Sequence, residues 1–207
     1  MTRFAAIVLA AGESRRMGEP KQLLPWGEHT IVEQVVSTLL RSPLDEIVVV
    51  VGHRADEVQA KIEGLSLKRA VGAPSTRTVM NARYRDGMLS SIQCGLEALA
   101  DNVRAAFIVL SDQPQLKRES LARLREAFES SNHGLVVPSH RMRRGHPLLL
   151  DVRKYRGEIL ALDGTPGLQK ILRAHPDDIL HVEFDDPGVL ADVDTRQDYE
   201  RAAPGKD

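Results

Sequence analysis

The sequence contains very little cysteine: Cys94 is the single one among 207 residues. One thiol can form neither an internal disulfide framework nor a cluster of thiolate metal ligands. Disulfide-dependent proteins are therefore excluded, and a reducing compartment such as the cytoplasm is the expected location.

The sequence also lacks long apolar runs and an excess of charge of either sign. No apolar run approaches the ~20 residues that a membrane-spanning helix needs, and the first residues show no signal-peptide pattern. The formal net charge of −1 at pH 7 argues against general affinity for nucleic acid or for an anionic membrane. We expect a soluble protein that binds neither.

No internal repeat, low-complexity tract or linker interrupts the chain. Its length suits one domain with a sizeable core, so we predict a single domain over residues 1–207.

Apolar runs and amphipathic segments alternate along the chain, which predicts alternating strands and helices. Residues 72–86 look polar and irregular, and Thr30 with Glu33 forms a capping box at the start of a helix. This alternation predicts an α/β fold with three layers (α/β/α) and a mainly parallel sheet. The predicted strands cover residues 4–9, 47–51, 105–110, 134–137, 147–150 and 179–183, with a weaker one over 67–71; the predicted helices cover 30–40, 54–63, 87–99 and 117–130, one or two between 152 and 175, and one from 196.

The loop over residues 9–21 directly follows the first predicted strand. Small residues such as Gly12 let backbone N–H groups approach a ligand, and Arg15 and Lys21 supply positive charge for phosphate oxygens. Its spacing fits neither the phosphate loop of P-loop proteins nor the dinucleotide fingerprint. The alternative is a loop that only turns the chain.

Asp112 follows the strand over 105–110, in the segment Ser111-Asp112-Gln113-Pro114. Ligands of open α/β sheets bind at the carboxyl ends of strands, where a carboxylate can hold Mg²⁺ beside nucleotide phosphates. The alternative is a turn or helix-capping aspartate.

Three further segments carry candidate binding residues. Gly87, Ser90 and Ser91 stand at the start of a predicted helix, which favours an anion or a base edge, although the serines can also cap that helix. Asn81 lies before them without an obvious turn partner, which favours a functional role.

In the second segment, Arg144 and His146 precede the strand that Pro147 begins, where they can reach a phosphate-bearing ligand or merely form a solvated turn and the cap of the strand. In the third, Asp192 and Asp194 alternate along an extended stretch, so we expect only one to face the site.

The segment from Leu9 to Lys21 reads L-A-A-G-x-S-x-R-M-G-x-x-K. It resembles the signature of nucleotidyltransferases with the nucleotide-diphospho-sugar transferase-like fold, and most closely that of the molybdenum cofactor cytidylyltransferase family. Segments 81–92, 143–150 and 191–199 resemble the family's other motifs.

The resemblance implies a set of site residues. Arg15, Lys21 and Asp112 would be catalytic, and Asp112 and Asp194 would hold Mg²⁺, with Asp192 the alternative to Asp194. The nucleotide would bind to Leu9, Ala10, Ala11, Gly12, Ser14, Arg15, Lys21, Asn81, Gly87, Ser90 and Ser91, and the acceptor to Gln113, Pro114, Arg144, His146 and Pro147.

One segment departs from the family pattern. Where these enzymes commonly carry G-D-x-G-x-R, this chain has Thr165 in place of the acidic residue and Gln169 in place of the arginine. Glutamine has neither the charge nor the fork geometry of arginine. The nucleotide half of the pattern is thus intact and the acceptor half is altered.

The implied activity is Mg²⁺-dependent transfer of CMP from CTP to the phosphate of a molybdopterin-type cofactor, with release of pyrophosphate and with a molybdoenzyme as a further partner. The pair Ala10-Ala11 resembles the cytidylyl-transferring branch, whereas the guanylyl-transferring branch tends to carry L-A-G-G. Two alternatives remain: a nucleotidyltransferase for a sugar phosphate or other phosphorylated acceptor, and a non-catalytic nucleotide-binding accessory protein for a molybdoenzyme.

Overall fold

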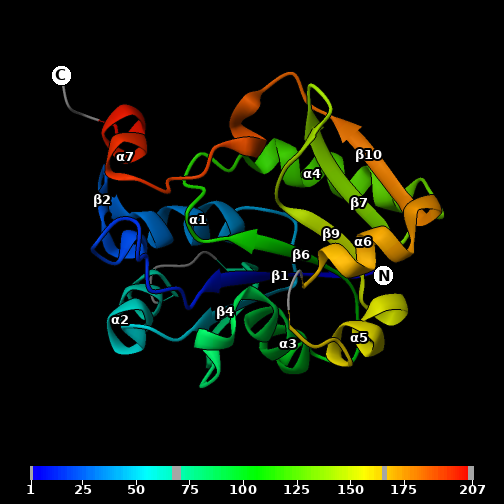
Figure 1. The fold of residues 1–207 in the computed structure, drawn as a ribbon, viewed down its shortest axis with the longest axis horizontal. Helices are drawn as coiled ribbons and strands as arrows, with labels where there is room; N and C mark the ends of the chain where they lie inside the picture. The colour runs from blue at the N-terminus through cyan, green and yellow to red at the C-terminus, as the bar shows by residue number, and fades with distance from the viewer. Residues whose placement is uncertain (1, 67–70, 165–166, 205–207) are drawn as a thin grey trace.

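The computed structural model describes residues 2–66, 71–164 and 167–204. Most of the weak strand predicted over 67–71, and Thr165, lie outside these residues. The described chain is built around one eight-stranded sheet (Figure 1).

The sheet is mainly parallel, as predicted. Its strand order is β10-β7-β9-β6-β1-β4-β5, with β8 paired to β7. The short strand β9 runs antiparallel to both β6 and β7, whereas β1 is parallel to β4 and β6. The strands are β1 (Arg3–Ala10), β4 (Glu46–Val51), β5 (Ser75–Met80), β6 (Val103–Leu110), β7 (Leu135–His140), β8 (Arg143–Arg144), β9 (Leu148–Asp151) and β10 (Ile179–Glu183).

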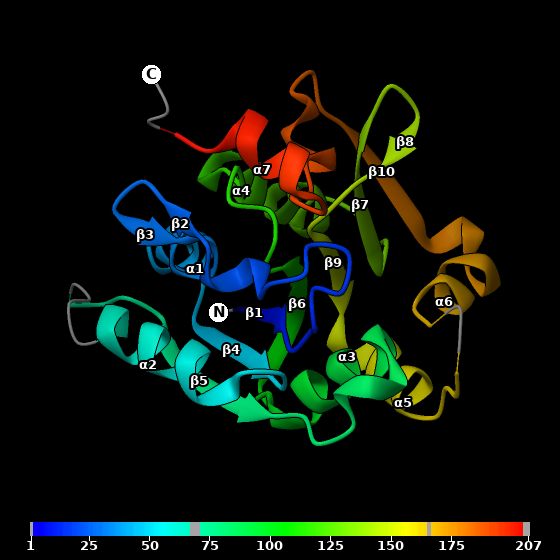
Figure 2. The same cartoon turned by 60° about the vertical axis from the view of Figure 1, so that its left-hand side comes forward.

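Helices cover both faces of the sheet because successive strand residues point to opposite sides. Phe4, Ala6 and Val8 of β1 join the core beneath α1, α2 and α4, and Ala5 and Ile7 join the core beneath α3, α5 and α6. Figure 2 shows α3, α5 and α6 on one side of the sheet and α1 and α4 on the other. The helices are α1 (Ile31–Leu40), α2 (Ala55–Ser66), α3 (Met88–Ala98), α4 (Arg118–Glu129), α5 (Val152–Leu160), α6 (Gln169–Ala174) and α7 (Arg196–Ala202).

The predicted capping box of α1 is confirmed: Thr30 accepts a hydrogen bond from the backbone of Glu33, whose side chain accepts one from the backbone of Thr30. Thr195 and Asp198 form the same arrangement at α7. Among the described residues, none of the helices combines the length and apolar character that crossing a membrane requires.

The polar stretch predicted to be irregular contains strand β5, so that prediction is wrong. β5 is an edge strand that pairs only with β4, and it is largely half-buried or exposed. Threonine and serine are tolerated there because the strand needs little apolar burial. A second omission is the small hairpin of β2 (Pro25–Trp26) and β3 (His29–Thr30), which is too short to show periodicity.

Candidate active site

The loop after β1 is folded around Ser14. This residue has a positive φ of 54°, and its hydroxyl accepts a hydrogen bond from the backbone N–H of Lys21 (3.0 Å) and donates one to Oε1 of Gln22 (3.1 Å). Its carbonyl accepts from the N–H groups of Met17 (2.9 Å) and Gly18 (3.2 Å). Ser14 therefore shapes the loop and fixes the backbone from which the Lys21 side chain projects.

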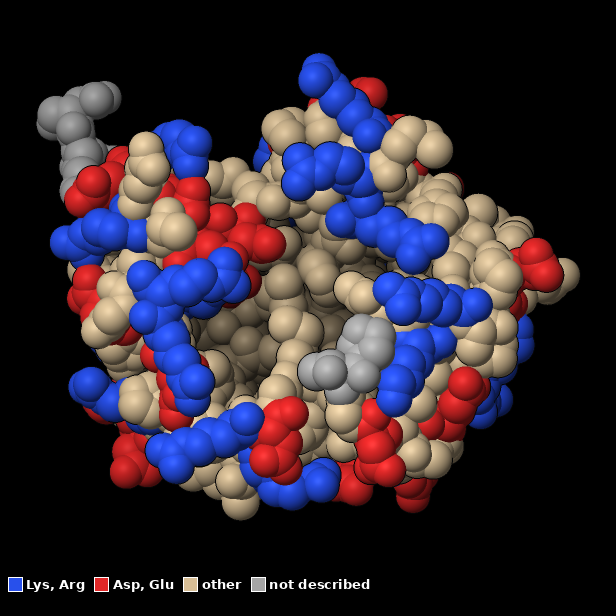
Figure 3. All heavy atoms as spheres, in the orientation of Figure 1, with Lys and Arg blue, Asp and Glu red and all other residues tan. Residues whose placement is uncertain are grey.

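This loop lines a cavity of about 400 Å³ at the carboxyl ends of β1 and β6, which we call the strand-end cavity. Figure 3 shows the hollow, with acidic side chains on its upper left wall. Of the predicted nucleotide and metal residues, Ala10, Asn81 and Ser90 do not line it. Those that do are Leu9, Ala11, Gly12, Ser14, Arg15, Lys21, Gly87, Ser91, Asp112 and Asp194.

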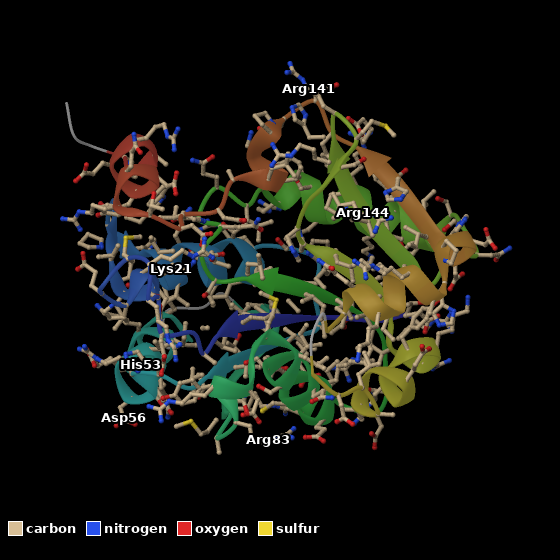
Figure 4. The ribbon with its side chains drawn as sticks, viewed as in Figure 1. Lys21, His53, Asp56, Arg83, Arg141 and Arg144 are labelled. Atoms are coloured by element: carbon tan, nitrogen blue, oxygen red, sulfur yellow. The ribbon has the colours of Figure 1, made fainter. Side chains whose placement is uncertain are left out.

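Lys21 lies between two carboxylates in the strand-end cavity. Its ammonium donates to Oδ2 of Asp112 and to Oδ1 of Asp194, the latter at 2.8 Å. The Lys21 side chain is 18% exposed and that of Asp112 is 15% exposed, so water screens this pairing poorly. Figure 4 shows Lys21 within this part of the molecule.

Electrostatics favour the charged forms of Lys21 and Asp194. Burial alone would lower the pKa of Lys21, but Asp112 and Asp194 outweigh it and the pKa is raised. The hydrogen bond from Lys21 lowers the pKa of Asp194 against the effect of burial. The site thus holds an ammonium and two carboxylates in close contact.

A divalent cation fits this donor set. Oδ1 of Asp112 is buried without a hydrogen-bond partner among the described residues, although a buried carboxylate oxygen normally has one. Within the described part of the chain, no three His, Cys, Asp or Glu side chains are grouped to hold a metal. Asp112 and Asp194 could therefore bind Mg²⁺ only if other oxygens, such as nucleotide phosphates, complete the coordination.

Two arginines of the same loop stand at the rim of the strand-end cavity. Nε of Arg15 lies 2.7 Å from Oε2 of Glu13, and Nη1 of Arg16 lies 2.9 Å from Oδ2 of Asp194. Glu13 also binds Arg85 at 3.1 Å. Because both loop arginines are mostly exposed, they can exchange these partners for a phosphate at little cost.

Asn81 has turn partners, contrary to the prediction. Its amide donates to the hydroxyls of Ser90 (2.9 Å) and Ser91 (3.0 Å), and its carbonyl oxygen accepts from the N–H of Arg83 (2.9 Å). Ser90 in turn donates to the backbone oxygen of Gly87 (2.8 Å). Asn81 and Ser90 hold the loop before α3 in shape, while Ser91 and Gly87 line the strand-end cavity.

Tyr84 is a lining residue that the sequence analysis missed. A Cβ at Gly52 would lie 2.7 Å from Cβ and Cγ of Tyr84 and 2.9 Å from Cβ of Ala11, so the glycine permits close packing of these three residues. Tyr84 lines the strand-end cavity together with Asp112 and Lys21. The sequence does not predict β5, so it could not place Tyr84 in the loop that follows this strand.

A second cavity of about 770 Å³ lies between β9, α3 and α6, and we call it the hairpin cavity. Gly87 and Met88 line both cavities, so the two meet there. Of the predicted acceptor residues, Arg144 and His146 line the hairpin cavity. Gln113, Pro114 and Pro147 are buried and line neither cavity.

Gln113 instead binds the second aspartate of the C-terminal segment. Its amide donates to Oδ1 of Asp192 at 2.6 Å, while the neighbouring Asp194 contacts Lys21. Burial, followed by the nearby Asp112 carboxylate, raises the pKa of Asp192. Asp192 and Asp194 thus have different partners, and Asp194 is the one that lines the strand-end cavity.

Comparison with known proteins places this geometry in a family. The MobA-like NTP transferase domain matches residues 6–179. The chain is 26% identical over 199 residues to the molybdenum cofactor cytidylyltransferase of Escherichia coli strain K12, which covers 96% of this chain and 95% of that protein. It is 29% identical to the nicotine blue oxidoreductase of Paenarthrobacter nicotinovorans, with 91% of each covered. A probable molybdenum cofactor guanylyltransferase of Bacillus anthracis is 28% identical, with 98% and 96% covered.

Solved structures show the same fold. The crystal structure of Rv0371c from Mycobacterium tuberculosis H37Rv superposes with a TM-score of 0.80 at 26% identity, over 99% of this chain and 98% of that one. A structure of the same protein in complex with manganese has a TM-score of 0.77 at 25% identity, with 99% of each chain covered. The matched region contains the loop after β1, β6 and both cavities' main walls. The chain therefore belongs to the family of nucleotidyltransferases with a MobA-like NTP transferase domain.

Proposed function

We propose that this protein transfers the CMP group of CTP to the phosphate of a molybdopterin-type cofactor and releases pyrophosphate. The observation that carries the proposal is the contact of Lys21 with both Asp112 and Asp194 at the end of β6, beside a second cavity. Such a site offers a cation for a triphosphate and carboxylates for a divalent metal. The cytidylyltransferase relative supports the choice of acceptor.

The strand-end cavity is the proposed nucleotide site. Lys21 and Arg15 would bind triphosphate oxygens, and Ala11 and Gly12 would lie against the base. The carbonyl oxygens of Ala11 and Gly12 already accept hydrogen bonds from His53 (3.1 Å) and Gln22 (3.3 Å). These contacts hold the loop firmly, and a rigid loop suits discrimination between bases.

Asp112 and Asp194 are the proposed metal ligands, and Mg²⁺ is the proposed ion. The structure of Rv0371c with manganese supports the use of a divalent metal in proteins of this fold. When bound, the metal would offset the repulsion between the triphosphate and the acceptor phosphate.

The reaction needs no nucleophile from the protein. An oxygen of the acceptor phosphate attacks the α-phosphorus of CTP, a new P–O bond forms, and the bond to the β-phosphate breaks with its electron pair leaving on pyrophosphate. A phosphate is already ionised at neutral pH, so no side chain has to remove a proton from it. The protein contributes charge through Lys21 and Arg15 on one substrate and Arg144 on the other, and His146 helps to position the acceptor.

The test is a panel of CTP, GTP, ATP and UTP with Mg²⁺ and either purified molybdopterin or a sugar phosphate as acceptor, in which pyrophosphate release is measured. We expect release with CTP above the other triphosphates, and release that is slower by roughly 10²–10³-fold with the Asp112→Asn variant. A preference for GTP would support nucleotidyl transfer but show that the proposed nucleotide, CTP, is wrong. Pyrophosphate release only with a sugar phosphate would show that the proposed acceptor, a molybdopterin-type cofactor, is wrong. CTP binding without pyrophosphate from any acceptor would indicate an accessory protein, and an oxidoreductase like the relative from Paenarthrobacter would also release none.

A further inference from the structure

Two arginines line the hairpin cavity without a partner. In the part of the chain that the structure describes, Arg144 and Arg173 make neither an ion pair nor a side-chain hydrogen bond, although both line this cavity. Asp86 is the one acidic residue among the described lining residues. Figure 3 shows basic side chains along the right side of the hollow, opposite the acidic wall. The hairpin cavity therefore carries an excess of positive charge on its lining.

The helix α6 holds Arg173 on the cavity side. Ile171 of this helix is fully buried in the core with Ile159. Gln169, Leu172 and Arg173 all line the hairpin cavity, as expected for residues three and four positions apart on one helix face. The end of α6 is fastened to α5, because His175 binds Glu158 at 2.8 Å. These contacts fix the direction from which Arg173 approaches a ligand.

Arg144 lines the same cavity from a different element. It belongs to β8, where it pairs with Ser139 of β7. The next residue, Gly145, donates to the carbonyl of Pro138 (2.8 Å), and a Cβ there would lie 2.3 Å from the carbonyl oxygen of Val189. Figure 4 shows Arg144 near the base of the hairpin whose tip carries Arg141. The hairpin is thus packed tightly enough to hold Arg144 in place.

Apart from its arginines, the hairpin cavity is mostly apolar. A ligand that fills it would match this composition with a planar or apolar body and an anionic group. The apolar lining residues are Met88, Leu89, Ile92, Ile108, Val137, Leu148, Leu168 and Leu172.

We propose that Arg173 acts with Arg144 as an anion-binding pair that determines the affinity of the protein for its acceptor, a molecule with a planar or apolar body and an anionic group. This inference rests on the proposed nucleotidyl transfer for the identity of the acceptor. It also accounts for the altered acceptor motif: Gln169 stands where the motif has arginine, and Arg173 places a guanidinium one helical turn later on the same face.

The test compares Arg173→Gln and Arg144→Gln with the parent protein. Binding of purified molybdopterin is measured by titration calorimetry without nucleotide, and the KM values for CTP and for molybdopterin are measured separately. Loss of one charge-assisted contact at an exposed position should weaken molybdopterin binding by about tenfold. The KM for CTP should stay within about twofold of the parent's, because neither arginine lines the strand-end cavity.

Arg153→Gln is the matched control. Arg153 is also exposed and has no ion-pair partner among the described residues, but it lies beside Thr2 and Arg3 in another cavity. We expect parental molybdopterin binding from this variant. Adding Gln169→Arg to Arg173→Gln should recover most of the lost affinity, because it returns a guanidinium to the same helix face.

The outcomes separate this inference from the proposed function. If Arg173→Gln binds molybdopterin as tightly as the parent does, the assignment of Arg173 to an anion-binding pair is wrong, whether or not the parent releases pyrophosphate. If Arg173→Gln weakens molybdopterin binding and the parent releases no pyrophosphate from CTP, the anion-binding role of Arg173 is supported and the proposed nucleotidyl transfer is wrong. A rise in the KM for CTP equal to the rise for molybdopterin would also overturn the inference, because it would indicate general damage.

Discussion

In the strand-end cavity every described lysine or arginine that lines the wall contacts a carboxylate, whereas the two arginines of the hairpin cavity contact none. Lys21 binds Asp112 and Asp194, Arg16 binds Asp194, and Arg15 binds Glu13. A buried charge without a partner is costly, and Lys21 is mostly buried. Exposed guanidinium groups carry little such cost, so the hairpin cavity can keep its arginines unpaired.

This difference indicates which charge the ligand of each cavity carries. The strand-end cavity contains both an ammonium and carboxylates, which suits a ligand that brings anionic oxygens together with a cation. The hairpin cavity has an excess of positive charge and suits an anion alone. Substitutions in the two cavities should therefore affect the two substrates separately.

The largest effect is expected from Asp112→Asn. The substitution removes one negative charge beside Lys21 and replaces one oxygen of a carboxylate, whose buried Oδ1 has no partner among the described residues, by an amide NH2 group. Transfer should fall by roughly 10²–10³-fold, because electrostatic groups at a reacting phosphate are worth about that much. Pyrophosphate release at several Mg²⁺ concentrations is the measurement, with circular dichroism as the control for folding.

Asp194→Asn should act in the same direction but less strongly, since Asp194 is 33% exposed. If Asp192→Asn proves the more damaging of the two, the metal ligand has been assigned to the wrong aspartate. Activity of Asp112→Asn equal to the parent's would remove Asp112 from the mechanism.

Lys21→Ala should weaken nucleotide binding by roughly 10–100-fold, the equivalent of about 1.5–3 kcal/mol for a charged hydrogen bond. The binding of molybdopterin should be unaffected, because Lys21 does not line the hairpin cavity. Calorimetric titration of each ligand without the other checks both expectations. Equal weakening of both ligands would contradict the separation of the two cavities.

The fold was predictable where burial is continuous and less so where it is partial. Residues 47–51 and 105–110 are unbroken apolar runs, and each lies inside an observed strand. The edge strand β5 was missed because its first four residues are polar and only one neighbour pairs with it. Local patterns report local burial, and an edge strand has little of it.

The candidate site was predictable residue by residue but not in its arrangement. Motifs identified Lys21, Asp112 and Asp194, yet the contact between Lys21 and Asp194 joins residues 173 positions apart and required the fold. Tyr84 and Arg173 were missed because no motif marks them and only tertiary packing brings them to the cavities. Asn81 was misread for the same reason, since its partners Ser90 and Ser91 come from the following helix.

Two glycines offer a matched pair of substitutions. Gly52→Ala would press a Cβ against Tyr84 and Ala11 in the strand-end cavity, and Gly145→Ala would press one against Val189 beneath the hairpin. Each should cost about 1–3 kcal/mol of stability through overpacking. Gly52→Ala should raise the KM for nucleotide by about tenfold, and Gly145→Ala the KM for acceptor by a similar factor.

Gly157→Ala is the control for this pair, because a Cβ at that position in α5 meets nothing within 4 Å. It should leave both KM values unchanged and, if anything, stabilise the helix. Steady-state kinetics with each substrate varied in turn, together with thermal melting, gives all the quantities. Identical kinetic changes in Gly52→Ala and Gly145→Ala would mean that the cavities do not work independently.

A smaller effect is expected on the choice of base. Ala11 lines the strand-end cavity and is only 4% exposed, so its methyl group occupies space that a larger base would need. Ala11→Gly should lower the ratio of kcat/KM for CTP to that for GTP by about tenfold, which is the typical worth of one methyl group in a pocket. A parent enzyme that already prefers GTP would contradict the proposed cytidylyl transfer.

The smallest effect concerns pH and the hairpin cavity. Burial lowers the pKa of His146 from the ordinary value of 6.5, although the nearby Asp192 and Asp112 carboxylates oppose this. The folded protein therefore binds this proton less readily than the unfolded chain does. The contribution of the neutral imidazole to stability is complete above pH 6.5 and is lost as the pH falls through the lowered folded pKa.

The free energy of unfolding should accordingly decrease below about pH 6.5, and His146→Gln should make that decrease shallower. Asp192 has a raised pKa and takes up a proton in the folded state more readily, so it opposes the loss at lower pH and keeps the total effect small. Urea denaturation of both proteins between about pH 5 and pH 8 measures the slopes. His181→Gln is the control, because His181 lies on β10 and lines neither cavity. A parental slope in His146→Gln would show that the imidazole is not kept neutral by its burial beside Asp192.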